Sequence, residues 1–360
     1  MKIAQVCPRY YPDIGGVETH VQEISERLVK RGFEVDVVCT DPTGKLPKHD
    51  VINGVTINRF RSFAPGDAYY FAPQIYFYLR NQNYDLIHAH SYHALPALFA
   101  ALAKNKCRLI FTPYYHGGGH TPIRNFLHMP YRSLGSKIFE KSDKVTCISE
   151  YERSKVISDF GVPLAKIEKI PIGLNLEEFK KLKYQKKNKG GKTLLYVGRL
   201  EEYKGIQHII KTLPYLAGFK LEVIGKGPYE KRLNKLAEEL SVTKQINWYK
   251  NMTREELLQY YASADVFLML STHESYGITV VEALLAGTPC IVTNGSALEE
   301  FVDGRLCLGI ENPITSDKLI LAIKQLYESG IKDTMENINI PIFNWNEVTD
   351  KLIEVYKNTL

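Results

Sequence analysis

Short apolar runs alternate with amphipathic stretches along the first half of the chain. One amphipathic stretch, residues 17–31, ends just before Gly32 and predicts a helix. The apolar runs are short and rich in β-branched residues, which is typical of buried strands, and they lie at residues 3–7, 34–40, 85–90, 108–113 and 144–149. Strands that alternate with helices predict an α/β fold with a parallel sheet covered on both faces.

The same alternation starts again in the second half. Apolar runs lie at residues 193–198, 220–225, 246–250, 266–270 and 289–293, separated by helical stretches that include 228–240 and 253–264. The sequence therefore predicts two doubly wound, Rossmann-like units. Ligands of such sheets bind beyond the carboxyl ends of the strands, so we expect two domains that face each other across a cleft lined by strand-end loops.

Residues 180–192 separate the two halves, because they combine a run of lysines with Gly190 and Gly191 and contain no acid. We therefore expect an N-terminal domain at 1–179, a basic linker at 180–192 and a C-terminal domain at 193–344. The alternative is a lysine-rich surface loop within one domain. A final amphipathic stretch predicts a helix within residues 345–360 that docks on the rest of the protein.

Composition limits the class of protein. With 360 residues, of which 44% are hydrophobic, the chain can bury a core in each of two domains. It has neither a long uncharged apolar run nor a signal-peptide pattern at its start, so we expect a cytoplasmic protein. The six cysteines are far apart without CxxC spacing, which favours reduced core thiols over disulfides or a zinc site.

The net charge of +6 is unevenly distributed. Besides the lysine-rich segment, basic residues gather at 104–144, where Glu140 and Asp143 are the only acids. Such a stretch could face phosphates of a lipid, a nucleic acid or an anionic saccharide, or it could be an ordinary solvated surface. The aromatic run at 68–80 could stack on sugars or lie at a membrane interface, but the pattern favours a helix that is part of the core.

The strongest chemical signal is residues 273–289, which follow a predicted strand and begin a helix. Gly277 suggests that Glu274 lies in the loop and Glu282 one turn inside the helix. Free N–H groups near Gly277, Ile278 and Thr279 could then bind a phosphate while the two carboxylates accept hydroxyls of the same ligand. The alternative is an ordinary pair of helix and surface carboxylates.

Two further strand ends of the second domain carry suitable residues. Gly198, Arg199 and Lys204 lie in the loop after the first strand, and the two cations could converge on a diphosphate. Gly225 and Gly227 follow the next strand and would let a flat ring approach the backbone. Each signal is weak alone, but their order at successive strand ends favours one nucleotide site.

The first domain offers fewer signals. Gly15 and Gly16 lie between the first strand and its helix, where the backbone could approach an anion or a sugar, and His116 follows a strand end. His88 and His90 share a strand face, but we expect hydrogen-bonded histidines rather than a metal site. No DxD motif or P-loop is present, so we expect neither a metal ion nor a cofactor.

Taken together, several motifs resemble those of the retaining GT-B glycosyltransferases of family 4, the glycosyl transferases group 1. The motifs are GGVE at 15–18, His116, GRLEEYKG at 198–205, GKGP at 225–228 and Glu274 to Glu282 followed by EALLAGTP. The resemblance implies two Rossmann-like domains, of which the first binds the acceptor and the second the nucleotide sugar, and a C-terminal helix that returns to the first domain. Ser296 departs from the family pattern, which leaves the choice of sugar open.

The resemblance also implies roles for single residues. Arg199 and Lys204 would bind the donor diphosphate, Glu282 the ribose hydroxyls and Glu274 the transferred sugar. His116 would face that sugar, and Gly16 would lie near the sugar or the phosphates.

We therefore expect transfer of a hexose, from UDP- or GDP-hexose in preference to other donors, to a hydroxyl acceptor with retention and without metal. A lipid-linked glycan, a polysaccharide or a small sugar would fit as acceptor, and residues 104–144 could contact the inner membrane face; nucleic acid is not expected. The alternatives are a nucleotide-sugar epimerase of the same architecture, a sugar phosphorylase and a non-catalytic sugar-nucleotide-binding protein.

Overall fold

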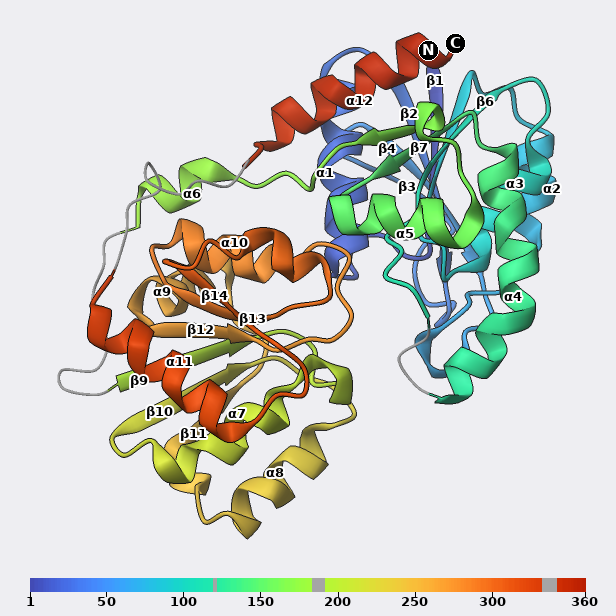
Figure 1. Cartoon of the computed structure of the whole chain (residues 1–360). Helices are drawn as coiled ribbons and strands as arrows, with labels where there is room; N and C mark the ends of the chain where they lie inside the picture. The colour runs from blue at the N-terminus through green and yellow to red at the C-terminus, as the bar shows by residue number, and fades with distance from the viewer. Residues whose placement is uncertain (119–121, 183–191, 332–341) are drawn as a thin grey trace. The chain divides into compact units, whose positions relative to one another are not determined.

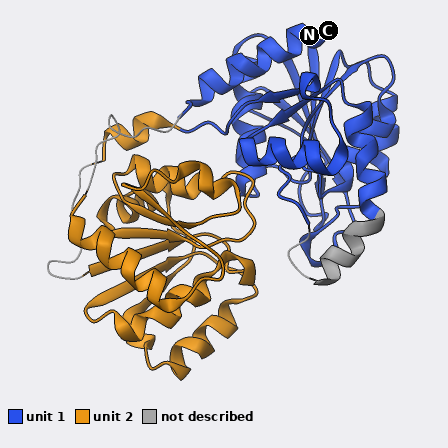
Figure 2. Cartoon of the chain, viewed as in Figure 1, with its two compact units in different colours: residues 1–174, 342–360 blue, residues 175–341 orange. Residues whose placement is uncertain are grey.

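The chain forms two compact units, which Figure 2 distinguishes by colour. Unit 1 comprises residues 1–174 and 342–360, and unit 2 comprises residues 175–341. The structure, a computed structural model, describes residues 1–118, 122–182, 192–331 and 342–360, and only the backbone of 122–130. Most of the expected basic linker therefore lies outside the described residues.

In the described part of unit 1, eight strands form one sheet in the order β3-β4-β2-β1-β5-β6-β7-β8. All neighbours are parallel except β3 and β4, which form an antiparallel hairpin. The strands are β1 (Lys2–Val6), β2 (Glu34–Asp41), β3 (His49–Ile52), β4 (Val55–Arg61), β5 (Leu86–His90), β6 (Arg108–Thr112), β7 (Lys144–Cys147) and β8 (Ile167–Lys169).

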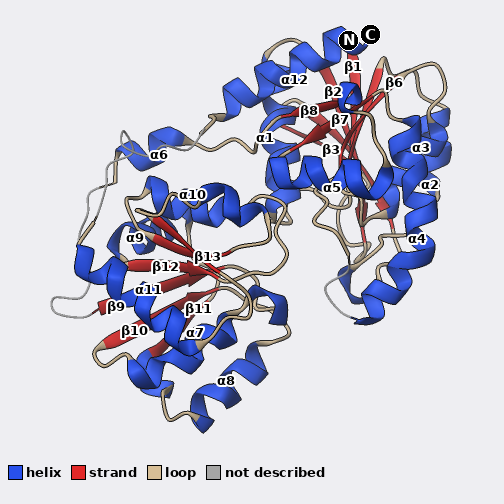
Figure 3. Ribbon diagram, viewed as in Figure 1, coloured by secondary structure: helices blue, strands red, loops and turns tan. Residues whose placement is uncertain are grey.

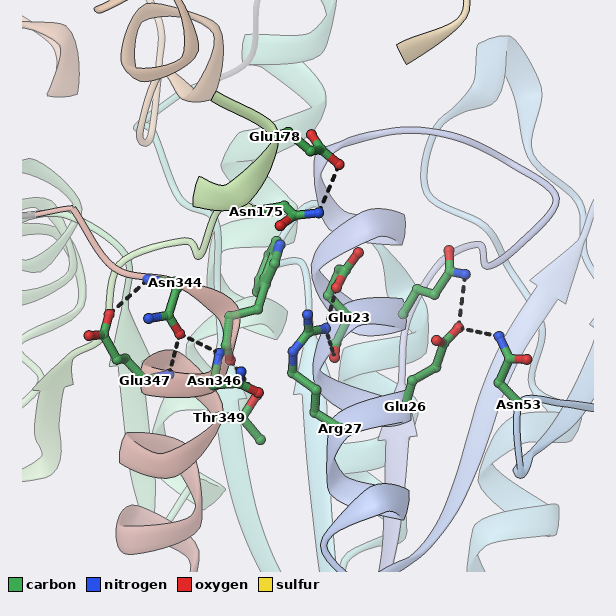
Figure 4. Close-up of polar contacts among 12 residues, drawn as sticks. Glu23, Glu26, Arg27, Asn53, Asn175, Glu178, Asn344, Asn346, Glu347 and Thr349 are labelled. Carbon is green, nitrogen blue, oxygen red and sulfur yellow. Dashed lines mark hydrogen bonds and ion pairs between the residues drawn. The ribbon is translucent and has the colours of Figure 1, made fainter. Parts of the chain in front are cut away.

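The β3–β4 turn is Asn53-Gly54, both with positive φ, as a tight hairpin of twisted strands requires. The Asn53 side chain donates to Glu26 of α1 (Gly16–Lys30), a contact visible in Figure 4. The hairpin is thereby attached to the helix that follows β1.

Side chains of β1 and β5 alternate between two faces of the unit 1 sheet. Ala4 and Ala89 belong to a hydrophobic cluster that also contains residues of the helices α2 (Gln74–Arg80), α3 (Leu95–Ala103), α4 (Pro122–Lys141) and α5 (Glu150–Phe160). Gln5 and His88 instead contact Tyr356 of α12 (Trp345–Thr359). Because successive strand residues point in opposite directions, one strand serves both layers.

The C-terminal helix α12 packs beside α1 within unit 1, as Figures 1 and 3 show. Asn344 begins α12 with a capping box: its side chain accepts from the N–H of Glu347, whose carboxylate accepts from the N–H of Asn344 (Figure 4). Arg31 donates to Asp350 at 2.9 Å. The expected return of the last helix to the first half of the chain is confirmed.

In the described part of unit 2, six parallel strands form a sheet in the order β11-β10-β9-β12-β13-β14. The strands are β9 (Lys192–Val197), β10 (Phe219–Ile224), β11 (Ile246–Tyr249), β12 (Val266–Met269), β13 (Cys290–Thr293) and β14 (Cys307–Ile310). The helices are α6 (Leu176–Lys180), α7 (Ile206–Thr212), α8 (Glu230–Glu239), α9 (Arg254–Ser263), α10 (Ile278–Leu285) and α11 (Ser316–Ser329). The two doubly wound α/β units predicted from the sequence are confirmed.

Within the aromatic run at 68–80, residues 74–80 form α2, and its buried residues Ile75 and Leu79 belong to the core, as expected. Phe71 and Phe77 of the same run are exposed, so the run is only partly a core helix. All six cysteines are free, and all except the half-buried Cys107 are buried, as expected. None of the described helices combines the length and apolar character that a membrane crossing requires.

Candidate functional site

In unit 2 the strand order reverses between β9 and β12. The chain leaves β9 for β10 on one side, and it later returns to place β12 on the other side of β9. The loops that follow β9 and β12 therefore meet at the carboxyl edge of the sheet, which is where ligands of open α/β sheets bind. These loops are residues 198–205 and 270–277, and they contain most of the candidate residues.

The glycines of this edge allow strand-end loops to lie against each other. A Cβ on Gly225 would lie 1.9 Å from the carbonyl oxygen of Gly198, and a Cβ on Gly227 would lie 2.3 Å from that of Leu200. No side chain fits at these distances, so packing of the two loops already requires glycine. The expected contact of Gly198, Gly225 and Gly227 with a ligand stays a prediction.

Lys204 and Glu274 form an ion pair that joins the two loops. Both side chains are mostly buried, and the Lys204 ammonium lies 5.1 Å from the centre of the Tyr203 ring. Burial lowers the pKa of Lys204, but the Glu274 carboxylate and Tyr203 together more than offset burial, so this pKa is raised above its usual value. A charged lysine is thus held at the sheet edge.

Arg199 lies in the same loop and is more exposed. Its guanidinium pairs with Glu201 at 3.0 Å, and 63% of its side chain is accessible to solvent. The buried Tyr196 hydroxyl donates to the carbonyl of Arg199 at 2.8 Å and so fixes the backbone, while the side chain extends outward. The guanidinium is near enough to Lys204 to oppose its charge.

Helix α10 begins at this edge without an acidic residue in its first turn. Its N-cap, Gly277, has a φ of 104°, and a Cβ there would lie 2.4 Å from Leu298. Among the described residues, no acceptor is recorded for the N–H groups of Ile278 and Thr279. A helix start with open N–H groups and no acid of its own is suited to an anion.

Glu282 lies one turn into α10, as the sequence predicted, and Glu274 lies in the preceding loop. The Glu282 carboxylate is buried, accepting from Arg254 at 2.5 Å and from the hydroxyl of Tyr261 at 3.0 Å. Burial raises the pKa of Glu282, and the Arg254 guanidinium opposes this rise.

Sequence reasoning missed Arg254 and Tyr261, although both lie on the predicted helix 253–264. Arg254 follows Thr253, which caps α9 together with Glu256, so the local sequence indicates a helix start and nothing more. No signal within the chain connects these residues to Glu282 until α9 and α10 pack together.

In unit 1, Gly15 is the N-cap of α1 and Gly16 its first residue. The Glu18 carboxylate folds back toward this end, so a Cβ on Gly15 would lie 2.3 Å from a Glu18 oxygen, whereas the space beside Gly16 is open. Glu18 also pairs with Arg9 at 3.2 Å. The chain thus supplies its own negative charge to α1.

The histidines of unit 1 separate into two groups. His116 is half-buried in the loop after β6, and its ring stacks on that of His93 at 4.7 Å. His88 contacts Tyr356 and Thr112, and His90 contacts Gln5 and Tyr114. The prediction that His88 and His90 are hydrogen-bonded histidines is confirmed.

Metal ligands do not gather in the described residues: no group of three or more His, Cys, Asp or Glu side chains there could hold an ion. The charges of residues 104–144 are partly neutralised within the protein. Lys104 and Arg108 both pair with Asp143, and Lys144 pairs with Glu168. Arg124 lies outside the described side chains.

Comparison with known families identifies the chain. Residues 14–178 match Glycosyltransferase Family 4, and residues 177–339 match Glycosyl transferases group 1. The chain belongs to the group 1 glycosyltransferases. It is a glycosyltransferase of the GT-B fold that uses nucleotide sugar donors, and family 4 is a retaining family.

Three relatives illustrate the range of this glycosyltransferase family. The chain is 27% identical to an uncharacterised glycosyltransferase of Methanocaldococcus jannaschii, with 99% of this chain and 98% of the relative covered. It is 27% identical to alpha-monoglucosyldiacylglycerol synthase of Streptococcus pneumoniae, with 85% of this chain and 74% of the relative covered. It is 26% identical to GDP-mannose:cellobiosyl-diphosphopolyprenol alpha-mannosyltransferase of Xanthomonas oryzae, with 100% of this chain and 97% of the relative covered.

Solved glycosyltransferase structures share the fold. Sucrose-phosphate synthase of Thermosynechococcus elongatus matches with a TM-score of 0.80 at 19% identity, over 99% of this chain and 98% of the other. HepE of Anabaena, solved in complex with UDP, matches with a TM-score of 0.77 at 17% identity, over 99% and 100%.

Proposed function

We propose that this glycosyltransferase transfers a hexose from UDP- or GDP-hexose to a hydroxyl acceptor, with retention at the anomeric carbon and without a metal ion. Unit 2 binds the donor and unit 1 binds the acceptor. The choice of donors is supported by two relatives: HepE binds UDP, and the Xanthomonas enzyme is named for GDP-mannose.

The observation that carries the proposal is the meeting of Lys204, Glu274 and the start of α10 at one strand-order reversal. A donor diphosphate needs fixed positive charge, which Lys204, Arg199 and the N–H groups of Ile278 and Thr279 supply. Glu274, released from Lys204 when the diphosphate takes its place, accepts hydroxyls of the hexose. Gly198, Gly225, Gly227 and Gly277 bring the backbone close to the nucleotide.

The ribose of the donor binds to Glu282, since a carboxylate accepts two hydroxyls at once. In unit 1, His116 faces the transferred sugar. Gly15 and Gly16 come near the sugar rather than the phosphates, because Glu18 already occupies the end of α1 with negative charge.

The reaction requires that the bond between the anomeric carbon and the phosphate oxygen breaks while a bond to the acceptor oxygen forms on the same face. Negative charge then develops on the diphosphate, and preorganised cations and N–H groups lower the barrier most effectively there. The departing phosphate oxygen accepts the acceptor proton. Glu274 positions the sugar, and no covalent intermediate forms on it.

We further propose a lipid-linked acceptor and contact with the cytoplasmic membrane face through the basic stretch 104–144. Two relatives are named for a diacylglycerol product and a diphosphopolyprenol acceptor. The exposed rings of Phe71 and Phe77 would suit an apolar partner. Polysaccharide and small sugars are the other acceptors to test.

Incubation with UDP-, GDP- and ADP-hexoses, with and without each class of acceptor, tests the function. We expect nucleoside diphosphate release that depends on the acceptor, and a product whose anomeric configuration by NMR equals that of the donor. A chelator should leave the rate unchanged.

Other outcomes would identify other activities. Epimerisation of the donor sugar without acceptor would indicate an epimerase, and dependence on free phosphate would indicate a phosphorylase. Donor binding without any turnover would indicate a binding protein. An inverted product or loss of rate with chelator would contradict the proposed mechanism.

A further inference from the structure

Glu282 is held by two donors that reach different oxygens of its carboxylate. Arg254 Nη1 donates to Oε1 at 2.5 Å, and Tyr261 Oη donates to Oε2 at 3.0 Å. Both donors come from α9, whereas Glu282 comes from α10. The carboxylate plane is therefore oriented from one side, by a neighbouring helix.

This arrangement leaves half of the acceptor capacity of Glu282 unused. An ionised carboxylate has about four lone-pair sites, two on each oxygen. Arg254 and Tyr261 occupy one on each, so one site remains on each oxygen. Two adjacent acceptor sites match two adjacent hydroxyls, such as the 2′- and 3′-hydroxyls of a ribose.

Arg254 is itself fixed by the first helix of unit 2. Its Nε donates to Glu178 Oε2 at 2.9 Å, and its guanidinium lies 5.7 Å from the centre of the Phe179 ring. Glu178 also accepts from the Asn175 side chain at 2.8 Å, as Figure 4 shows. A continuous series of polar contacts thus connects Asn175, the first residue of unit 2, to Glu282.

We infer that Arg254 is a positioning residue that orients the Glu282 carboxylate toward both ribose hydroxyls and thereby determines discrimination between ribo- and 2′-deoxyribonucleotide donors. The inference rests on the proposed function, in which Glu282 binds the ribose. Arg254 acts through Glu282 and need not touch the donor. Glu178 and Phe179 keep the guanidinium in place when the site is empty.

The charges around Glu282 give the inference a second measurable consequence. Burial raises the pKa of Glu282, and Arg254 is the cation that opposes this rise; Tyr261 donates to the carboxylate, and Glu178 adds a negative charge nearby. Without Arg254 the pKa must rise further, because burial and Glu178 remain. A protonated carboxyl would lose acceptor capacity as the pH falls toward that pKa.

Calorimetric titration with a ribonucleotide and its 2′-deoxy analogue tests the inference. The pair is UDP and 2′-deoxy-UDP, or GDP and 2′-deoxy-GDP if guanine is the preferred base. We expect wild type to prefer the ribonucleotide by roughly tenfold or more, the cost of leaving a buried acceptor unpaired. In Arg254→Gln the preference should fall below about threefold. Affinity of this variant for the ribonucleotide should also fall more steeply than that of wild type as the pH is lowered, and the wild-type titration accounts for the protonation of the phosphate itself.

Three further variants separate positioning from a general structural role. Arg254→Lys should recover part of the preference, because it keeps the charge. Lys235→Gln removes a cation from the exposed Lys235–Glu239 pair of unit 2 and should leave the preference unchanged. In a Glu282→Gln background, Arg254→Gln should change the preference no further.

The outcomes separate a failure of this inference from a failure of the proposed function. If wild type prefers the ribonucleotide and Arg254→Gln keeps both that preference and the pH profile of wild type, the inference is wrong and the proposed function stands. If wild type binds no nucleoside diphosphate, the proposed function falls and the inference falls with it.

Discussion

In both units the strand order reverses beside the first strand, between β1 and β5 in unit 1 and between β9 and β12 in unit 2. The charges at the two reversals differ. In unit 1, Arg9 pairs with Glu18, nine residues away, and Glu18 also covers the start of α1. In unit 2, Lys204 pairs with Glu274 from another loop, and the start of α10 has no acid.

The difference shows that one architecture can carry different charges at the same edge of its sheet. A helix start that is already neutralised by its own chain has little to offer a diphosphate, whereas a start without an acid and near a charged lysine has much. The strands beside the two reversals also differ in polarity. Strand β5 of unit 1 contains the buried polar residues His88 and His90, whereas β12 of unit 2 is apolar throughout. The buried histidines of β5 are hydrogen-bonded within unit 1, whereas the charged residues of unit 2 lie in the loops beyond its strands.

The largest expected effect comes from breaking the Lys204–Glu274 pair. Lys204→Ala should lower the transfer rate by ~10²–10³-fold, since a fixed charge at the leaving group is lost. The matched variant is Arg9→Ala, which removes the corresponding pair of unit 1 and should leave affinity for the nucleoside diphosphate unchanged. Steady-state rates and calorimetry measure the two effects. Near-normal transfer by Lys204→Ala would contradict the proposed role of Lys204 at the diphosphate.

A smaller effect, on stability, is expected when a glycine at the start of α10 or of α1 is replaced by alanine. Gly277→Ala should destabilise unit 2 by roughly 2–4 kcal/mol, because its φ is positive and the Cβ would overlap Leu298. Gly16→Ala should be nearly neutral, since nothing lies within 4 Å of its Cβ. Urea unfolding of both variants checks the contrast, and equal losses would contradict it.

The smallest effect concerns acid stability of unit 1. Burial lowers the pKa of His20 to about 4, and neither of its ring nitrogens has a hydrogen-bond partner among the described residues. Its pKa in the unfolded chain is higher, so the unfolded state binds more protons, and stability is lost as the pH falls from about 6.5 toward 4. His20→Phe should reduce the loss between pH 7 and pH 5 by about 2 kcal/mol.

The two tryptophans allow this measurement to be made on each unit separately. Trp345 lies in unit 1, with its ring 5.6 Å from His20, and Trp248 lies on β11 of unit 2. In a Trp248→Phe background, urea unfolding followed by Trp345 fluorescence reports on unit 1. A pH dependence that stays the same after His20→Phe would show that other groups cause the acid loss.

Much of the fold was predictable because its signals are local. Five strands of each sheet and the start of α10 follow from runs of apolar residues and from Gly277. The hairpin β3–β4 and the edge strands β8 and β14 were missed. β8 is only three residues long, and half of β14 is incompletely buried, so neither has a long apolar run.

The candidate site was predictable as a set of loops but not as a set of contacts. Arg199, Lys204, Glu274 and Glu282 were singled out, but neither the pairing of Lys204 with Glu274 nor the partners of Glu282 were predicted. Lys204 meets Glu274 across 70 residues, and Arg254 meets Glu282 across 28. Tyr261 and Glu178 carry no local signal at all for a role beside Glu282.

The sequence by itself determined two α/β units, the family of glycosyltransferases and the loops that carry its chemistry, because periodicity, turn glycines and motif spacing act over a few residues. Only the tertiary structure decided which charges face each other. The order of strands in a sheet depends on packing of the whole unit, and it is this order that brings the ends of β9 and β12, and the helices α9 and α10, together.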